Sequence, residues 1–128
     1  MRLLLDTHTF LWWLAGHGGL TATARGAIDN RTNDTYVSAA TAWEITTKFR
    51  IGKLPHAGIV AKDVAVVIAD QEFFPLDVSV RHAQRAGALA GALRDPFDRM
   101  LIAQATIENM VLVSNETAFD AYAVQRLW

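Results

Sequence analysis

Two short segments without a single polar residue constrain the fold of this chain more than any other feature. Leu3-Leu4-Leu5 lies near the start of the sequence, and Val111-Leu112-Val113 lies near its end. Such runs are typical of strands that are covered on both faces of a parallel sheet. Helical patterns without hairpin turns separate the predicted strands, so right-handed crossovers are expected. The sequence therefore predicts an α/β fold with a mainly parallel central sheet and helices on both faces.

Capping residues and proline indicate where helices and strands begin and end. Asp95 followed by Pro96 is a strong helix start, and Thr7 and Ser38 are further candidate N-caps. Pro75 lacks a backbone donor, which places its strand at an edge or at the entry of the sheet. The predicted helices cover 7–16, 21–30, 38–52, 59–69, 79–89 and 95–105, and the predicted strands cover 2–6, 35–37, 73–78 and 110–114.

Length and composition favour one packed domain over residues 1–128. Hydrophobic residues make up 52% of the chain and charged residues 20%, which suits a buried core and argues against disorder. The chain has no cysteine, so thiolate metal sites are excluded and a reducing compartment, the cytoplasm, is expected. No apolar run reaches the roughly 18 residues of a membrane span. With a net charge of −1, nucleic-acid binding would have to rely on local basic patches and on metal.

Four acidic residues occur next to predicted strand ends or helix starts. They are Asp6, Glu44, Asp98 and Glu116. The carboxyl ends of parallel strands open a crevice in which ligands bind. Carboxylates gathered in such a crevice repel one another, and hard divalent cations that prefer oxygen ligands relieve this repulsion. The placement of the four acids therefore suggests a metal site.

Each acid also has an ordinary structural interpretation. Asp95 and Asp98 at a helix start are explained by capping and by the helix dipole. Asp6 and Glu116 also precede helical segments. Glu44 precedes Lys48 by four residues, which is the spacing of an exposed ion pair on a helix. Both interpretations stay open for each residue alone. The joint occurrence of the acids at successive strand and helix units favours the metal site.

Further signals concern the surroundings of these acids. Trp43, Ile45 and Phe49 are expected to anchor the helix that carries Glu44. The first helix, with Trp12 and Trp13, is apolar on more than one side, so part of it is expected to face a partner. Basic side chains near the acids are candidates for phosphate contacts, with a solvated helix face as an equally good explanation; they are Lys48, Arg50, Lys53, Arg94 and Arg99.

The segments LLLDTHTFLWWL, SAATAWEITTKFRIGKL, DPFDRMLIAQA and LVSNETAFDAY together resemble the PIN domain, and specifically the VapC-type toxins of toxin-antitoxin pairs. The resemblance spans nearly the whole chain. It implies a three-layer α/β/α fold with a parallel sheet of four or five strands. It also implies a Mg²⁺- or Mn²⁺-dependent endoribonuclease that acts on RNA, forms homodimers and is blocked by a VapB-like antitoxin.

The resemblance also assigns roles to individual residues. Asp6, Glu44 and Asp98 match the three acidic metal-site residues of the family. Glu116 matches a fourth acidic position that is commonly aspartate, so its longer side chain departs from the pattern. Ser114 matches a threonine or serine position and would orient a water molecule at the metal. These five residues are the predicted catalytic site, and the four acids among them are the predicted metal ligands.

Two alternatives remain beside this interpretation. A receiver or phosphohydrolase domain also gathers acids around Mg²⁺ at the ends of parallel strands. Receivers need paired acids after the first strand, and dehalogenase-like enzymes need a second aspartate two residues after Asp6, where this chain has His8. A non-catalytic antitoxin-binding module is the other alternative, with Glu116 marking a site that has lost activity.

Overall fold

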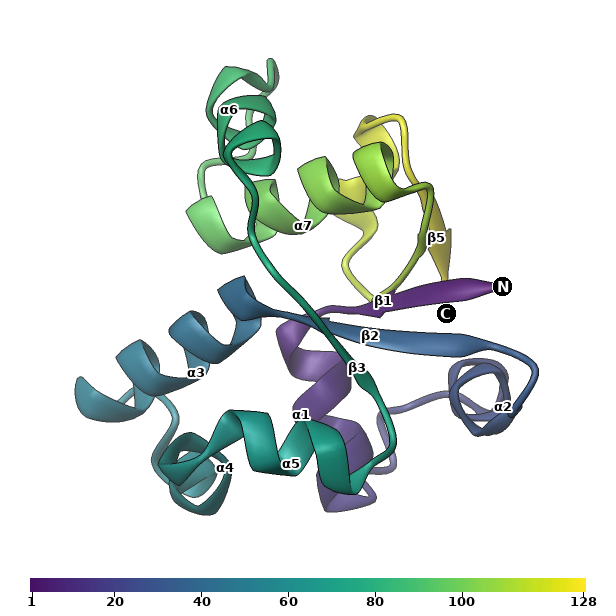
Figure 1. Ribbon diagram of the computed structural model, residues 1–128, viewed down its shortest axis with the longest axis vertical. Helices are drawn as coiled ribbons and strands as arrows, with labels where there is room; N and C mark the ends of the chain where they lie inside the picture. The colour runs from purple at the N-terminus through teal and green to yellow at the C-terminus, as the bar shows by residue number, and fades with distance from the viewer.

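The computed structural model describes all residues from 1 to 128 and contains one five-stranded sheet between two layers of helices (Figure 1). The strands are β1 (Arg2–Leu5), β2 (Asp34–Ser38), β3 (Phe74–Leu76), β4 (Val111–Val113) and β5 (Gln125–Leu127). The helices are α1 (Thr7–Ala15), α2 (Ala22–Asp29), α3 (Ala39–Arg50), α4 (Gly58–Lys62), α5 (Val64–Asp70), α6 (Val80–Ala88) and α7 (Pro96–Glu108), with short 3₁₀ helices η1 (Pro55–Ala57) and η2 (Thr117–Ala121). The predicted α/β/α fold is confirmed. None of its helices has the length and apolar character needed to cross a membrane.

Strand β1 lies at the centre of the sheet, whose order is β3-β2-β1-β4-β5. Every neighbouring pair is parallel, and Leu4 lies between Tyr36 of β2 and Leu112 of β4. The run Leu3–Leu5 is completely buried, as expected for a strand covered on both faces. Pro75 lies in the edge strand β3, where its missing donor disturbs no central pair.

Alternate side chains of β1 face two separate hydrophobic cores. Leu3 and Leu5 pack in one core with Phe10 of α1, and Leu4 packs in the other with Phe119 of η2. In Figure 1, α1, α3, α4 and α5 lie on one side of the sheet, and α6 and α7 lie on the other. The two cores are therefore separated by the sheet, and β1 belongs to both.

Side-chain caps begin the helices close to where the sequence predicts them. Ser38 and Asp95 each accept a hydrogen bond from an amide of the helix that follows. Thr7 is the predicted cap of α1, but the cap is Asp6, whose Oδ1 accepts a hydrogen bond from the amide of Thr9 at 2.7 Å. This cap fixes the Asp6 carboxylate at the carboxyl end of β1.

Two local predictions were wrong. The helix expected over 59–69 is interrupted at Asp63, where α4 ends and α5 begins. Asp63 has a φ of −158°, and its Oδ1 accepts a hydrogen bond from the amide of Val66 at 3.1 Å, so an aspartate cap starts a new helix. The pattern over 125–127 also indicates no strand, yet β5 pairs with β4 there. Backbone pairing at the sheet edge, rather than an apolar side-chain pattern, forms this strand.

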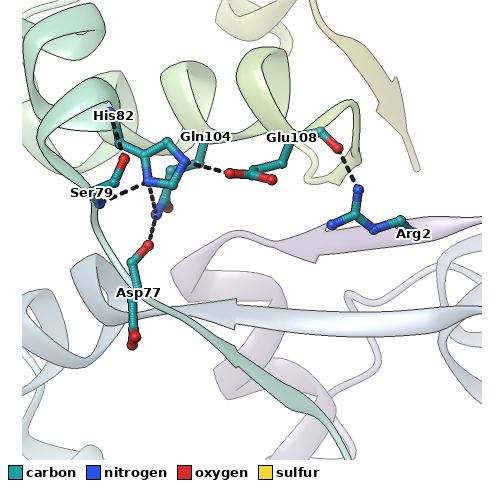
Figure 2. Close-up of polar contacts among 6 residues, drawn as sticks. All are labelled: Arg2, Asp77, Ser79, His82, Gln104 and Glu108. Atoms are coloured by element: carbon teal, nitrogen blue, oxygen red, sulfur yellow. Dashed lines mark hydrogen bonds and ion pairs between the residues drawn. The ribbon is translucent and has the colours of Figure 1, made fainter.

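A polar network joins α6 to α7 (Figure 2). His82 is 3% exposed; its Nδ1 accepts a hydrogen bond from the amide of Ser79 at 3.0 Å, and its Nε2 lies 2.9 Å from Oε1 of Glu108. Because Nδ1 is an acceptor, Nε2 carries the proton and donates a hydrogen bond to Glu108. Gln104 donates to the carbonyl oxygen of Asp77 at 3.2 Å. The network fixes the start of α6 against α7.

Replacing His82 by alanine is expected to lower the free energy of unfolding by about 2 to 4 kcal/mol, because it opens a cavity and removes the partner of buried polar groups. Urea unfolding followed by circular dichroism measures the change. The control is Arg81→Ala at the neighbouring exposed position, for which a change below about 0.5 kcal/mol is expected. A His82→Ala variant as stable as this control would contradict the structural role of the network.

Candidate active site

The carboxyl ends of β1 and β4 border a cavity of about 120 Å³. After β1 the chain enters α1 on one face of the sheet, and after β4 it enters η2 on the other face. Adjacent parallel strands whose connections leave to opposite faces open a crevice, which is the usual ligand site of such sheets. The cavity is lined by Asp6, Thr7, His8, Glu44, Lys48, Asp95, Asp98, Asn115 and Glu116. The structure therefore brings the four predicted acids together around one cavity.

Asp6 is held at the end of β1 through both its main chain and its side chain. Its amide donates to the carbonyl oxygen of Val113 at 3.2 Å, and its Oδ1 accepts the hydrogen bond from Thr9. The hydroxyl of Thr9 donates to the same Val113 carbonyl at 2.9 Å. Asp6 is 6% exposed, so water solvates its carboxylate poorly. One carboxylate is thus fixed where β1 and β4 diverge.

Glu44 lies in the middle of α3 and is 5% exposed. The hydroxyl of Thr7 donates to its Oε1 at 2.5 Å, and the ammonium group of Lys48 pairs with its Oε2. The ion pair that the spacing predicts is present, but it lies within the cavity lining rather than on an exposed helix face. Ile45 is buried, whereas Trp43 is 63% exposed and Phe49 is 40% exposed, so only Ile45 of the three predicted anchors lies in the core.

Asp95 and Asp98 lie at the start of α7. Oδ1 of Asp95 accepts hydrogen bonds from the amides of Phe97 at 2.8 Å and Asp98 at 3.3 Å, so Asp95 is the predicted cap and also lines the cavity. Burial raises the pKa of Asp98 to about 7. Repulsion from the carboxylates of Asp95, Glu44 and Asp6 contributes to this raised pKa. The cavity therefore holds more negative charge than its protein surroundings compensate.

Glu116 and Ser114 follow β4. Glu116 is exposed, and its Oε1 accepts a hydrogen bond from the amide of Ala118 at 3.0 Å, which caps η2. Ser114 is fully buried; its Oγ accepts a hydrogen bond from the amide of Glu116 at 2.9 Å, and it does not line the cavity. Arg126 supports this segment by donating to the Ser114 carbonyl oxygen and by pairing with both oxygens of Asp120. Ser114 therefore holds the main chain of Glu116.

The donor chemistry of the cavity fits a divalent cation. Five carboxylates line it, and Lys48 is the only lysine or arginine beside them. Oxygen ligands of this kind suit Mg²⁺ and Mn²⁺. No three acidic or histidine side chains are arranged to hold an ion as they stand. Three of the carboxylates, those of Asp6, Asp95 and Glu116, cap helices, and Glu44 pairs with Lys48. Each cap uses one oxygen of its carboxylate, so the second oxygen is free to bind an ion.

Two residues near the cavity have roles that the sequence does not indicate. Arg99 is a candidate for phosphate contacts, but its guanidinium donates to backbone carbonyl oxygens, among them those of Leu89 and Leu93, and so clamps the segment before α7. Thr7 orients Glu44 through a hydrogen bond between residues 37 positions apart. No local spacing rule could have found that contact.

The raised pKa of Asp98 predicts that the metal-free protein loses stability as the pH rises. Aspartate titrates near about 3.9 in an unfolded chain, whereas Asp98 in the folded protein titrates at about 7. Between these values the folded state binds more protons than the unfolded state, so the free energy of unfolding falls with pH and levels off above about 7. Asp98→Asn should flatten this dependence and raise the melting temperature at pH 8 more than at pH 4. Thermal melts in EDTA measure it, and identical pH curves for the two proteins would refute it.

Residues 3–125 match the family model of the PIN domain. Similar solved structures include VapBC2 from Rickettsia felis bound to a promoter DNA fragment, with 16% identity, a TM-score of 0.70 and 100% of both chains covered. VapBC-1 from nontypeable Haemophilus influenzae has 15% identity and a TM-score of 0.68, covering 98% of this chain and 96% of that one. A toxin-antitoxin complex from Klebsiella pneumoniae has 17% identity and a TM-score of 0.56, covering 93% of this chain and 90% of that one.

A comparison with curated protein sequences gives no significant match. The structural likenesses show a shared fold, and the family model matches nearly the whole chain. On this basis the protein belongs to the PIN domain family.

Proposed function

We propose that this protein is a metal-dependent endoribonuclease of the VapC type, the toxin of a toxin-antitoxin pair, and that it acts on RNA in the cytoplasm. One observation carries the proposal: Asp6, Glu44, Asp98 and Glu116 come from four separate segments and line one cavity at the end of the sheet. The similar structures support it, because they include VapBC assemblies and a toxin-antitoxin complex.

The four acids are the proposed ligands of one or two Mg²⁺ or Mn²⁺ ions. Such an ion, when bound, polarises the phosphodiester and activates water for attack. The chain's own residues position the ligands: β1 fixes Asp6, Thr7 holds one oxygen of Glu44, and Ser114 holds the amide of Glu116. Glu116 is the least constrained acid because it is exposed, and its extra methylene gives it a longer reach than aspartate.

A specific observation favours a second candidate, the non-catalytic antitoxin-binding module. No three acids are arranged to hold an ion as they stand, and the fourth acidic position is glutamate. This candidate predicts antitoxin binding without RNA cleavage in either Mg²⁺ or Mn²⁺. The receiver or phosphohydrolase alternative is not supported, because the family match is to the PIN domain.

Partner binding is proposed at a second, apolar cavity of about 680 Å³. Leu11, Trp12 and Leu14 of α1 line it, together with Ile59 and Val60 of α4. Ile59 is 88% exposed, so this surface is open to a partner. The sequence predicts that the first helix is apolar on more than one side and that part of it faces a partner, and this surface includes such a side of α1. We propose that a segment of a VapB-like antitoxin packs here.

The protein is also proposed to form a homodimer, as the family resemblance implies. A third cavity of about 450 Å³ lies between α3, α6 and α7. The exposed Trp43 lines it in edge contact with Phe97, with ring centroids 5.0 Å apart. Exposed aromatic surface of this kind suits a contact between copies.

Asp6→Asn is expected to reduce Mg²⁺-dependent RNA cleavage by at least about a hundredfold, because it removes a charged ligand of the ion. Asparagine still caps helices well, so the fold should be retained. Cleavage of cellular RNA, followed by mapping of new ends, measures the activity, and EDTA should abolish it. Asp70→Asn, an exposed substitution outside the cavity, is the control. Undiminished cleavage by the Asp6→Asn variant would refute the proposed site.

Ile59→Glu is expected to weaken binding of the VapB-like partner by at least about tenfold, because it places a charge in an apolar interface. Val80→Glu is the matched control: Val80 is 84% exposed but lies on α6, away from this cavity. Copurification and titration calorimetry compare the variants. Equal affinities for the two variants would exclude this surface as the docking site.

A further inference from the structure

Lys48 lies in the cavity where a bound cation is expected. It is the only lysine or arginine among the lining residues. It follows Glu44 by one helical turn of α3, and its Nζ pairs with Oε2 of Glu44. The side chain is 28% exposed, and Nζ lies 6.0 Å from the centre of the Phe97 ring. A positive charge is therefore held among the carboxylates rather than in open solvent.

Both oxygens of Glu44 already have partners. Thr7 donates to Oε1, and Lys48 pairs with Oε2. Each oxygen keeps a further lone pair, so a divalent ion can bind Glu44 while Thr7 stays in place, but the ion then lies within a few ångströms of the Lys48 ammonium. The threonine hydroxyl is neutral, whereas the lysine ammonium repels any cation placed within a few ångströms of it. The ion and Lys48 therefore compete for the same carboxylate.

We propose that Lys48 is the internal counter-ion of the metal-free site, that a divalent ion displaces it from Glu44, and that the displaced ammonium binds a phosphate of the RNA substrate. This inference deepens the proposed endoribonuclease function, and its RNA step rests on that function. The four-carbon stem of lysine is flexible, and the side chain is partly exposed, so Nζ can leave Glu44 without movement of α3. Lys48 is then a substrate-positioning residue.

The first test measures Mn²⁺ affinity of the full chain by titration calorimetry without RNA. Lys48→Met keeps the apolar stem and removes the charge, so it should bind Mn²⁺ about tenfold more tightly than the unchanged protein. Lys48→Arg keeps the charge and should stay within about twofold of it. Lys62→Met changes the net charge equally, but Lys62 is exposed at the end of α4 and lines neither this cavity nor the proposed docking cavity, so it controls for long-range effects.

Thermal melts provide a second readout. Without metal, Lys48→Met leaves the buried Glu44 carboxylate without its cation, so Mn²⁺ should raise the melting temperature of this variant more than that of Lys62→Met. The competition is overturned if Lys48→Met binds Mn²⁺ no more tightly than Lys62→Met, if the two melting shifts are equal, or if neither the unchanged protein nor Lys48→Met binds Mn²⁺.

The RNA step is tested by kinetics at saturating Mn²⁺ with a short single-stranded RNA. Lys48→Met should raise KM at least about fivefold with a smaller change in kcat, because the lost contact is to a phosphate that positions the substrate. A KM equal to that of Lys62→Met overturns the phosphate contact. If the unchanged protein binds Mn²⁺ but cleaves no RNA, the endoribonuclease proposal fails, and the RNA step fails with it. The calorimetry still decides the competition at Glu44.

Discussion

Leu3, Leu4 and Leu5 have no exposed surface, and the strand that they form pairs with β2 on one side and β4 on the other. Because both faces of this strand are buried in separate cores, its register cannot shift by one residue without exchanging the two sets of side chains. The amide of Asp6 continues this register to the carbonyl oxygen of Val113. The position of the first acid is therefore a direct consequence of core packing.

The acids gathered at this point are mutually repulsive, and the protein compensates them in several ways. Amides at the starts of α1 and α7 donate to Asp6 and Asp95, and Lys48 pairs with Glu44. Asp98 has no such partner, and its pKa is raised to about 7. Compensation by caps, by one lysine and by a proton is thus incomplete at neutral pH. A cavity in which the carboxylates outnumber their positive partners is suited to bind a cation.

Local chemistry explains which parts of the structure were predictable. Ser38 and Asp95 cap the helices that follow them because capping depends on the residue and its immediate neighbours. The same local rule applies at Asp63, whose cap interrupts a segment that the sequence pattern predicts as one helix. Strand β5 was missed because its backbone pairs with β4 although its residues carry no strand pattern. Pairing partners distant in sequence decide edge strands of this kind.

The sequence by itself determined the parallel sheet, the buried first strand and the identity of the four acids, because apolar runs, caps and family motifs are local patterns. Only the tertiary structure decided how those acids are held. It showed that Glu44 is buried between Thr7 and Lys48, that Ser114 supports the Glu116 amide, and that Arg99 clamps a loop. These contacts join segments from different parts of the chain, or depend on which face of a helix packs against the sheet. They follow from packing around β1, and local sequence patterns do not predict such packing.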